Sequence, residues 1–277
     1  MIGLCTDSNS QMPAALAARY GIEVVPLTIT IDDVDYLEGV SLDADQFYAH
    51  YDGPVPPVVT TSLPSPGQFA AAYDDLIARG CTSILSVHVG TALSGTLNAA
   101  RLAVGAVPVP VRLVDSGTAS FGVSCCTWAA AQAIADGATL DQAAQVAEQL
   151  APTIGNAFVV GALAHLQRSG RAGDVGHLDG LPLLPVLSMR SELEVLARVP
   201  TLLEAINTMA SFAIGWGTRV RVAVGHSDAA TEPLGDALEE AVSEAASVVE
   251  VVRYRVGPSV GAHTGPGTVG CFVFPAG

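Results

Sequence analysis

Residues 83–104 read SILSVHVGTALSGTLNAARLAV, and the pattern of this segment predicts the fold class. Its apolar run over residues 83–89 predicts a buried strand of a parallel sheet. A turn rich in Gly, Ser and Thr follows at residues 90–96, and the apolar spacing of residues 96–104 predicts an amphipathic helix. A strand, a hydroxyl-rich turn and a helix in this order are typical of an open α/β sheet.

The same alternation extends over the first half of the chain. Apolar runs joined by amphipathic helices indicate parallel strands with right-handed crossovers. We therefore predict an N-terminal domain over residues 1–150, with an open parallel sheet covered by helices on both faces. A polar excursion at residues 32–57 interrupts the alternation. The expected strands are residues 2–5, 22–31, 83–89 and 111–114, and the expected helices are residues 13–20, 66–78, 96–104 and 124–135.

A helix over residues 140–150, closed by Pro152, marks a natural boundary. The second half, residues 151–277, is expected to form a mixed α/β domain. A Gly/Pro-rich loop separates its last two strands. The expected strands are residues 156–160, 219–225, 248–256 and 268–274, and the expected helices lie near residues 201–216 and 232–246.

The charge composition excludes several classes of protein. The net charge is −15, and every basic residue is arginine. Without lysine, the chain has neither a Schiff-base lysine nor a phosphate-loop lysine. The acidic balance argues against binding to nucleic acid, which requires clustered basic residues, and against docking on an anionic membrane.

Several features indicate a cytoplasmic protein without membrane insertion. The N-terminus reads MIGLCTDS and lacks the basic region of a signal peptide. The longest uncharged stretch, residues 116–135, is broken by polar residues and is not expected to cross a membrane. The histidines lack zinc-site spacing, so we expect no metal site. An odd number of cysteines, mostly in apolar runs, predicts reduced core thiols: Cys5, Cys81, Cys125, Cys126 and Cys271.

Hydroxyl-rich segments follow the predicted strands. They are residues 6–8, 90–96 and 115–117, and a similar segment at residues 60–66 opens a helix. Ligands of open parallel sheets bind at the carboxyl ends of the strands. Neutral hydroxyls and helix N-termini at that edge suit an anion. Helix capping alone is the simpler explanation for Ser65, whereas Gly95 beside Ser94 would let a ligand approach closely.

Two short motifs near the C-terminus are expected to carry no function. Residues 257–261 fit Gly-x-Ser-x-Gly, but a hydrolase nucleophile needs a helix directly after it, and more Gly and Pro follow. Residues 265–270 fit Gly-x-Gly-x-x-Gly, but a strand follows where a dinucleotide site needs a helix. His263 lies between these motifs among small residues, where its imidazole can reach a ligand.

Six segments in register make the chain similar to the DegV family of bacterial lipid-binding proteins. They are Thr6-Asp7-Ser8 with Pro13, Thr61-Ser62-Leu63-Pro64-Ser65, Leu93-Ser94-Gly95-Thr96, Val114-Asp115-Ser116, Leu166 through Gly170-Arg171, and His263-Thr264-Gly265-Pro266-Gly267. The resemblance implies two α/β domains with a long-chain fatty acid between them, its acyl chain in an apolar tunnel. It also implies that the chain is not itself an enzyme and needs no cofactor.

The resemblance assigns the carboxylate of the fatty acid to Thr61, Ser94 and His263. Asp7, Ser62 and Asp115 are expected around this cluster. Family members can present the bound acid to a separate kinase subunit, to which ATP and magnesium belong. Arg171 is retained as a residue for docking that subunit.

One departure puts the kinase partnership in doubt. The family commonly has a basic stretch where this chain has Pro200, Leu202, Leu203 and Glu204. A lipid carrier or sensor without a kinase partner is therefore an alternative. A second alternative is a serine hydrolase that uses Ser94, His263 and either Asp115 or Asp7.

Overall fold

The computed structural model describes residues 1–161, 183–189 and 192–276. The chain forms two compact units, the first made of Met1–Leu42 and Val58–Pro152 and the second of Asp43–Pro57 and Thr153–Gly277. The first unit therefore consists of two stretches of chain. The predicted division near residue 150 differs from these units in one segment, because Asp43–Pro57 groups with the C-terminal half.

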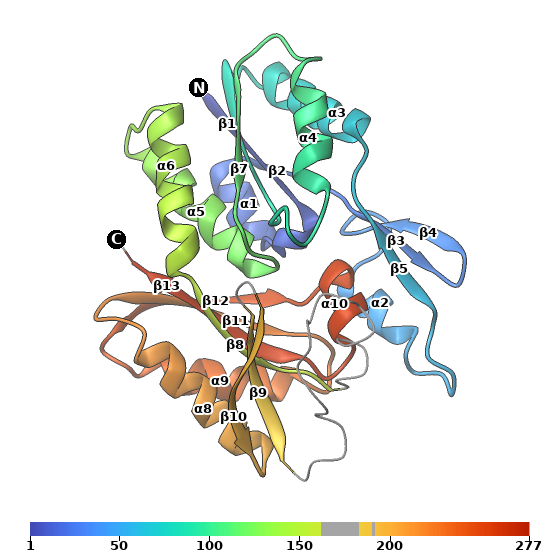
Figure 1. Cartoon of the computed structure of the whole chain (residues 1–277), viewed down its shortest axis with the longest axis vertical. Helices are drawn as coiled ribbons and strands as arrows, with labels where there is room; N and C mark the ends of the chain where they lie inside the picture. The colour runs from blue at the N-terminus through green and yellow to red at the C-terminus, as the bar shows by residue number, and fades with distance from the viewer. Residues whose placement is uncertain (162–182, 190–191, 277) are drawn as a thin grey trace. The chain divides into compact units, whose positions relative to one another are not determined.

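The first unit is built on a parallel four-stranded sheet of order β2-β1-β6-β7. Helices α3 and α4 cover one face, and α5 and α6 cover the other (Figure 1). The predicted open parallel sheet with helices on both faces is thus confirmed. The bounds are β1 Ile2–Asp7, α1 Ala14–Tyr20, β2 Ile22–Val25, α3 Pro66–Ala78, β6 Ser83–His88, α4 Thr96–Val104, β7 Val111–Asp115, α5 Phe121–Ala135 and α6 Leu140–Leu150.

The strand expected over residues 22–31 is two strands in two different sheets. Strand β2 ends at Val25, and β3 (Thr28–Ile31) pairs with β4 (Val34–Leu37) and β5 (Val59–Ser62) in a small antiparallel sheet. Pro26 separates them, because proline cannot donate to a strand ladder and is disfavoured inside a sheet. The single-strand prediction was wrong for this reason.

The second unit contains a mixed six-stranded sheet of order β10-β9-β8-β13-β11-β12. Only β11 and β12 are parallel among its paired strands in the described residues, and α9 connects them. Helices α8 and α9 pack on one face over an apolar core that includes Ile206, Val222 and Leu238. The bounds are α2 Ala44–Ala49, β8 Gly155–Val159, β9 Leu184–Met189, β10 Leu193–Val199, α8 Leu202–Ile214, β11 Val220–His226, α9 Glu232–Ser243, β12 Val248–Arg255, α10 Pro258–Thr264 and β13 Val269–Pro275.

The expected Gly/Pro-rich loop between the last two strands contains a helix, α10. Pro258 occupies its first turn, where the fixed φ of proline favours helix initiation and its missing N–H is not needed. Composition alone therefore misjudged this segment. Among the described residues, no helix is long and apolar enough to cross a membrane.

Candidate functional site

Ser94 lies in the turn that joins β6 to α4, at the carboxyl end of the parallel sheet. Its Oγ accepts a hydrogen bond from the backbone N–H of Thr96 at 3.3 Å and lies 2.8 Å from the hydroxyl of Thr96. Ser94 is half-buried, whereas Thr96 is fully buried. The hydroxyl of Ser94 is thus held at the start of α4, as the strand–turn–helix pattern predicts.

Thr61 does not lie at a helix start beside the parallel sheet, which corrects the sequence interpretation. It belongs to β5 of the small antiparallel sheet, opposite Ile29. The chain nevertheless returns to the Ser94 turn directly afterwards, because a Cβ on Gly95 would lie only 3.1 Å from Leu63 Cδ2. The half-buried Thr61 and the exposed Ser62 donate no side-chain hydrogen bond to another described residue.

Asp115, at the end of β7, holds the neighbouring turns together. Its carboxylate accepts hydrogen bonds from the Thr91 N–H at 3.2 Å, the Thr91 hydroxyl at 2.5 Å and the Gly117 N–H at 2.9 Å. The Gly90 N–H also donates to the Thr118 carbonyl at 2.8 Å. These contacts tie the turn after β7 to the turn that carries Ser94.

Asp7 takes part in a buried hydrogen-bond chain that the sequence analysis missed. Asp7 Oδ2 lies 2.9 Å from His88 Nδ1, His88 Nε2 lies 2.6 Å from Ser86 Oγ, and the Tyr73 hydroxyl donates to Ser86 at 3.0 Å. The N–H of Val89 also donates to Asp7 Oδ2 at 3.3 Å. The apolar run around His88 indicated burial, but nothing local pointed to a partner 81 residues away.

This Asp–His–Ser arrangement resembles the hydrogen-bond order of a hydrolase triad, but it has no access to substrate. Asp7, Ser86 and His88 are each 0% exposed. A nucleophile must reach its substrate, and these buried side chains cannot. The hydrogen-bond chain instead joins the ends of β1 and β6. Asp7 is hydrogen-bonded to His88, and Asp115 is hydrogen-bonded to Thr91 and Gly117. Both carboxylates of the hydrolase alternative therefore already have hydrogen-bond partners in the first unit.

The turn after β1 is fixed by further buried polar contacts. The Asn9 N–H donates to Asp7 Oδ1 at 3.1 Å, and Asn9 Oδ1 accepts from the backbone N–H of Ser120 at 3.1 Å. The Ser124 hydroxyl donates to the Ser10 carbonyl at 2.7 Å. The start of α5 is thereby fixed against the end of β1, so that three turns lie together at one edge of the sheet.

In the second unit, His263 lies in the last turn of α10 and is half-buried. The same short helix contains Ser259 of the Gly-x-Ser-x-Gly match, so a helix does follow β12, contrary to the sequence interpretation. Ser259 lies inside this helix and is 1% exposed, which is unlike the exposed serine of a nucleophile elbow. Arg171 and the segment at residues 166–171 lie outside the described residues.

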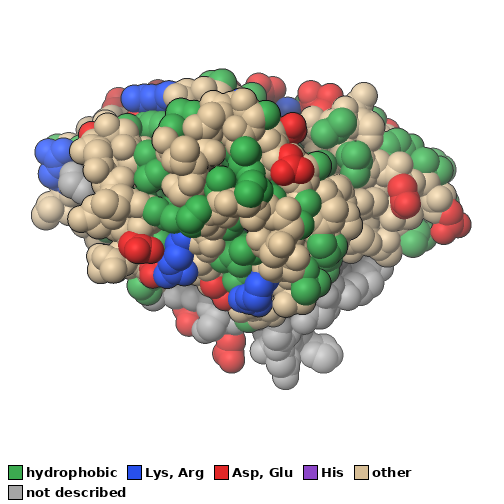
Figure 2. Space-filling model, turned by 90° about the horizontal axis from the view of Figure 1, so that it is seen from above, with side chains coloured by type: hydrophobic (Ala, Val, Ile, Leu, Met, Phe, Trp, Pro, Cys, Tyr) green, Lys and Arg blue, Asp and Glu red, His purple; other side chains and the backbone are tan. Residues whose placement is uncertain are grey.

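Other kinds of site find little support in the part of the chain that the structure describes. It contains no group of three or more His, Cys, Asp or Glu residues suited to a metal ion. On the face seen in Figure 2, the described arginines lie apart from one another, with acidic side chains beside some of them, rather than in a continuous basic patch. Nucleic acid binds to clustered basic residues, which that face does not offer.

Comparisons with known proteins agree on one family. Residues 1–276 match the family model described as "Uncharacterised protein, DegV family". A DegV domain-containing protein of Streptomyces coelicolor is 35% identical over 98% of both chains. A DegV family protein from Thermus thermophilus, described as fatty acid binding, is 30% identical with a TM-score of 0.87 over 99% of both chains. DegV of Bacillus subtilis, also described as a fatty acid binding protein, is 25% identical with a TM-score of 0.84 over 99% of this chain and 98% of its own.

Proposed function

Because the chain belongs to the DegV family, we propose that it binds a long-chain fatty acid and holds the carboxylate with the hydroxyls of Thr61 and Ser94. His263 completes this cluster in the proposal. The observation that carries it is the chemistry of the Ser94 turn. Gly95 lies against Leu63, two residues after Thr61, so the segments of both hydroxyl residues meet at one place in the first unit.

The hydroxyls of these two segments suit a carboxylate. Thr61 offers a half-buried hydroxyl that makes no hydrogen bond within the described residues, and Ser94 stands at the N-terminus of α4. Helix N-termini favour anions through their free N–H groups and dipole. A buried arginine would hold a carboxylate more tightly, whereas neutral donors leave it available for chemistry.

The nearby acidic residues do not oppose an anion as strongly as their number suggests. Asp7 is satisfied by His88 and by two backbone N–H groups, and Asp115 accepts three hydrogen bonds. Hydrogen bonds to a carboxylate spread and offset its charge. On the apolar side, burying roughly 14 methylenes contributes about 11 kcal/mol before the costs of association.

The role we favour is presentation of the bound acid to a separate kinase subunit, with ATP and magnesium on that partner. A carrier or sensor without a kinase remains the second candidate, favoured by the apolar side chains at Leu202 and Leu203, which are 43% and 67% exposed where the family is commonly basic. In both roles the chain itself performs no catalysis.

Native mass spectrometry of the purified protein tests the binding function, because a carrier is expected to retain a fatty acid. We expect Ser94→Ala and Thr61→Val each to weaken stearate binding by about 1–3 kcal/mol, the range for a hydrogen bond to a charged group. Thr60→Val is a matched control, since Thr60 is the neighbouring threonine on the opposite face of β5. Unchanged stearate binding in both site variants rules out this carboxylate site.

The hydrolase alternative is tested on the same proteins with a chromogenic short-chain ester. We expect no turnover, because neither Asp7 nor Asp115 is available to orient a catalytic histidine. Ester turnover that is lost in Ser94→Ala would instead establish a serine hydrolase.

A further inference from the structure

Ser120 has a backbone conformation that serine rarely adopts. It lies directly before α5 with φ 55° and ψ −146°. Side chains with a Cβ are strained in this region, which glycine occupies freely. Many positions of this kind in the chain are glycine, including Gly117 three residues earlier at φ 61°. A serine at position 120 therefore opposes the local backbone preference.

Contacts on the main chain explain how the strained conformation is held. The N–H of Ser120 donates to Asn9 Oδ1 at 3.1 Å, and its carbonyl accepts from the Val123 N–H at 3.0 Å. Neither contact needs the serine side chain, and a glycine would make both. The backbone geometry accounts for the bend before α5 but does not account for the hydroxyl.

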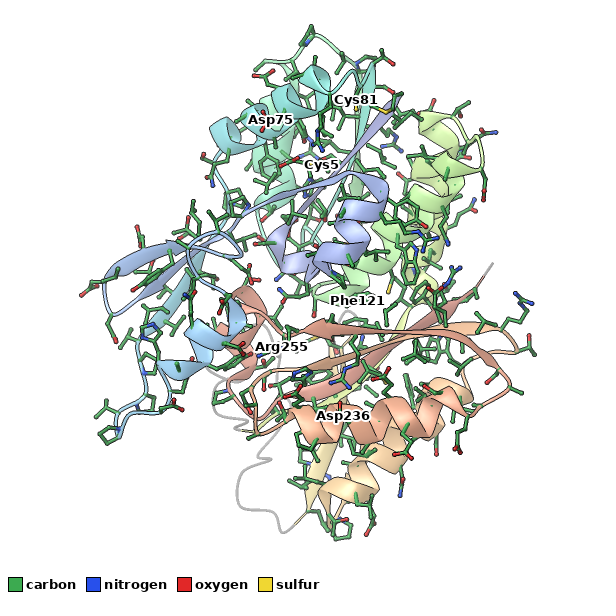
Figure 3. All side chains as sticks on the ribbon, turned by 180° about the vertical axis from the view of Figure 1, so that it is seen from behind. Cys5, Asp75, Cys81, Phe121, Asp236 and Arg255 are labelled. Carbon is green, nitrogen blue, oxygen red and sulfur yellow. The ribbon has the colours of Figure 1, made fainter. Side chains whose placement is uncertain are left out.

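The hydroxyl of Ser120 has no partner among the described residues, although the residue is only 8% exposed. Its oxygen retains some exposed surface, unlike the fully buried hydroxyls of Thr6 and Ser10, and is therefore accessible to a ligand. The residue also lies at the edge where the Ser94 turn is found. The hydrogen bond from Gly90 to Thr118 connects the turn after β6 with the turn after β7. The hydrogen bond from the Ser120 N–H to Asn9 connects Ser120 with the end of β1, and Figure 3 labels the adjacent Phe121.

We propose that Ser120 is a further ligand-binding residue, whose hydroxyl donates a hydrogen bond to the carboxylate head of the bound fatty acid. This inference rests on the proposed function. The strain is then retained because glycine would relax the backbone but remove the donor. Strained residues are concentrated at ligand sites in proteins for this reason.

A catalytic role for Ser120 is less consistent with its surroundings. A strained serine between a strand and a helix is also the setting of a hydrolase nucleophile. Such a serine needs a hydrogen-bonded base, and Ser120 has none within the described part of the chain. His88 of the same unit is already bound to Asp7 and Ser86. The hydroxyl is therefore assigned to binding.

Ser120→Gly and Ser120→Ala test this assignment together, with stearate affinity and Tm measured on delipidated full-length protein. Both variants lack the hydroxyl, and we expect each to bind stearate about tenfold more weakly. Ser120→Gly also relieves the strained backbone, so its Tm is expected to equal or exceed that of the wild type. Its Tm should also exceed that of Ser120→Ala by roughly a few degrees. Weaker binding in a protein of undiminished Tm is not expected from a purely structural residue.

Asp33→Gly is the matched control, because Asp33 also has a positive φ, 67°, but lies in the exposed turn between β3 and β4. We expect its stearate affinity to equal that of the wild type. If Ser94→Ala weakens binding while both Ser120 variants bind like the wild type, the role of Ser120 is overturned and the proposed function stands. If the wild-type protein binds no stearate, the proposed function fails and the inference fails with it.

Discussion

Thr96 places its fully buried hydroxyl 2.8 Å from the half-buried hydroxyl of Ser94. Thr96 makes no other side-chain hydrogen bond among the described residues, so its proton has one acceptor within reach. When Thr96 donates to Ser94, Ser94 Oγ accepts from both the hydroxyl and the N–H of Thr96. The proton of Ser94 is then left to donate to a ligand, which favours a head group that accepts hydrogen bonds.

Thr96→Val is therefore expected to weaken stearate binding by about 0.5–1.5 kcal/mol, the usual net contribution of one hydrogen bond, without contact between residue 96 and the ligand. Thr96→Ser should restore it. In a double-mutant cycle, Thr96→Val should have no further effect on Ser94→Ala, because Thr96 acts through the Ser94 hydroxyl. Additive losses, measured by titration calorimetry, would contradict this mechanism.

Asp7→Ala should strongly destabilise the first unit. The substitution removes the acceptor for His88 Nδ1 and for two backbone N–H groups in a site that is 0% exposed. Leaving three buried donors without an acceptor costs about 1–3 kcal/mol for each donor. Asp115→Ala is the matched control: it also removes a carboxylate that accepts three hydrogen bonds at a strand end, but Asp115 is exposed, so we expect about 1 kcal/mol. Equal losses in urea denaturation would show that the buried chain is not a structural element.

Three of the four strands of the parallel sheet, β1, β6 and β7, could be predicted because each is an apolar run closed by a hydroxyl-rich turn. The position of Thr61 could not be predicted in the same way. Strand β5 is four residues long, lies between Pro57 and Pro64, and reads Val-Thr-Thr-Ser, which resembles a turn as much as a strand. Its partner strand β3 is supplied from residues 28–31, a long-range pairing that local periodicity does not reveal.

The buried contacts of the candidate site were also beyond local patterns. His88 was one of several isolated histidines, and its pairing with Asp7 depends on the parallel register of β1 and β6. The strained backbone of Ser120 depends on the hydrogen bond between the turn after β7 and Asn9. A serine at that position does not predict a positive φ. Glycine would have been the natural signal, but the chain has serine there.

The five cysteines are expected to be unreactive in the folded protein. All are free and buried, and Cys5 and Cys81 lie inside the first unit (Figure 3). Burial raises the pKa of Cys5, Cys126 and Cys271 to about 12 and raises the pKa of Cys125 well above its ordinary value. The reactive species is the thiolate, which Cys5, Cys125, Cys126 and Cys271 do not form near neutral pH, and Cys81 is protected by its burial. A thiol reagent should label none of them before denaturation and all five afterwards; rapid labelling of the native protein would contradict their burial.

His226 should make the protein less stable in mild acid. Burial lowers the pKa of His226 below 6.5, with Arg255 and Arg253 contributing in the same direction. Because an arginine can only donate, the 3.0 Å contact of Arg253 Nη2 with His226 Nδ1 requires the neutral ring. Below about pH 6.5 the unfolded chain binds a proton that the folded protein does not, so stability is present above this pH and declines as the pH falls.

His226→Gln keeps an acceptor for Arg253 but does not titrate. Denaturation at a series of pH values should therefore show a smaller loss of stability between about pH 7 and about pH 5 in the variant than in the wild type. These two pH values lie on either side of the ordinary histidine pKa of about 6.5. Parallel pH profiles for the two proteins would show that His226 does not contribute to acid sensitivity.

Pro200 and the first turn of α8 bear on whether a kinase subunit docks on this protein. Strand β10 ends at Val199, and Thr201 caps α8 by accepting from the Glu204 N–H at 3.2 Å. Leu203 is 67% exposed in that turn. The resemblance implies basic side chains here, whereas this surface offers proline, leucine and a carboxylate. In the proposed docking of a kinase, charge-assisted hydrogen bonds and electrostatic steering toward an acidic partner are therefore both missing.

We therefore expect the protein to support acyl phosphate formation by a bacterial fatty acid kinase poorly, and Pro200→Arg to raise the rate. Pro200→Ala is the control that separates charge from backbone, because it restores the N–H and frees φ without adding a cation. Stearate affinity should be the same in all three proteins, since Pro200 follows β10, whereas the proposed carboxylate residues Thr61, Ser94 and His263 belong to β5, the turn before α4 and α10. A gain in Pro200→Arg but not in Pro200→Ala would assign the deficit to the missing charge, and equal gains would assign it to the shape of the β10–α8 turn. Full activity of the wild type, with no change on either substitution, would show that a different surface carries the docking.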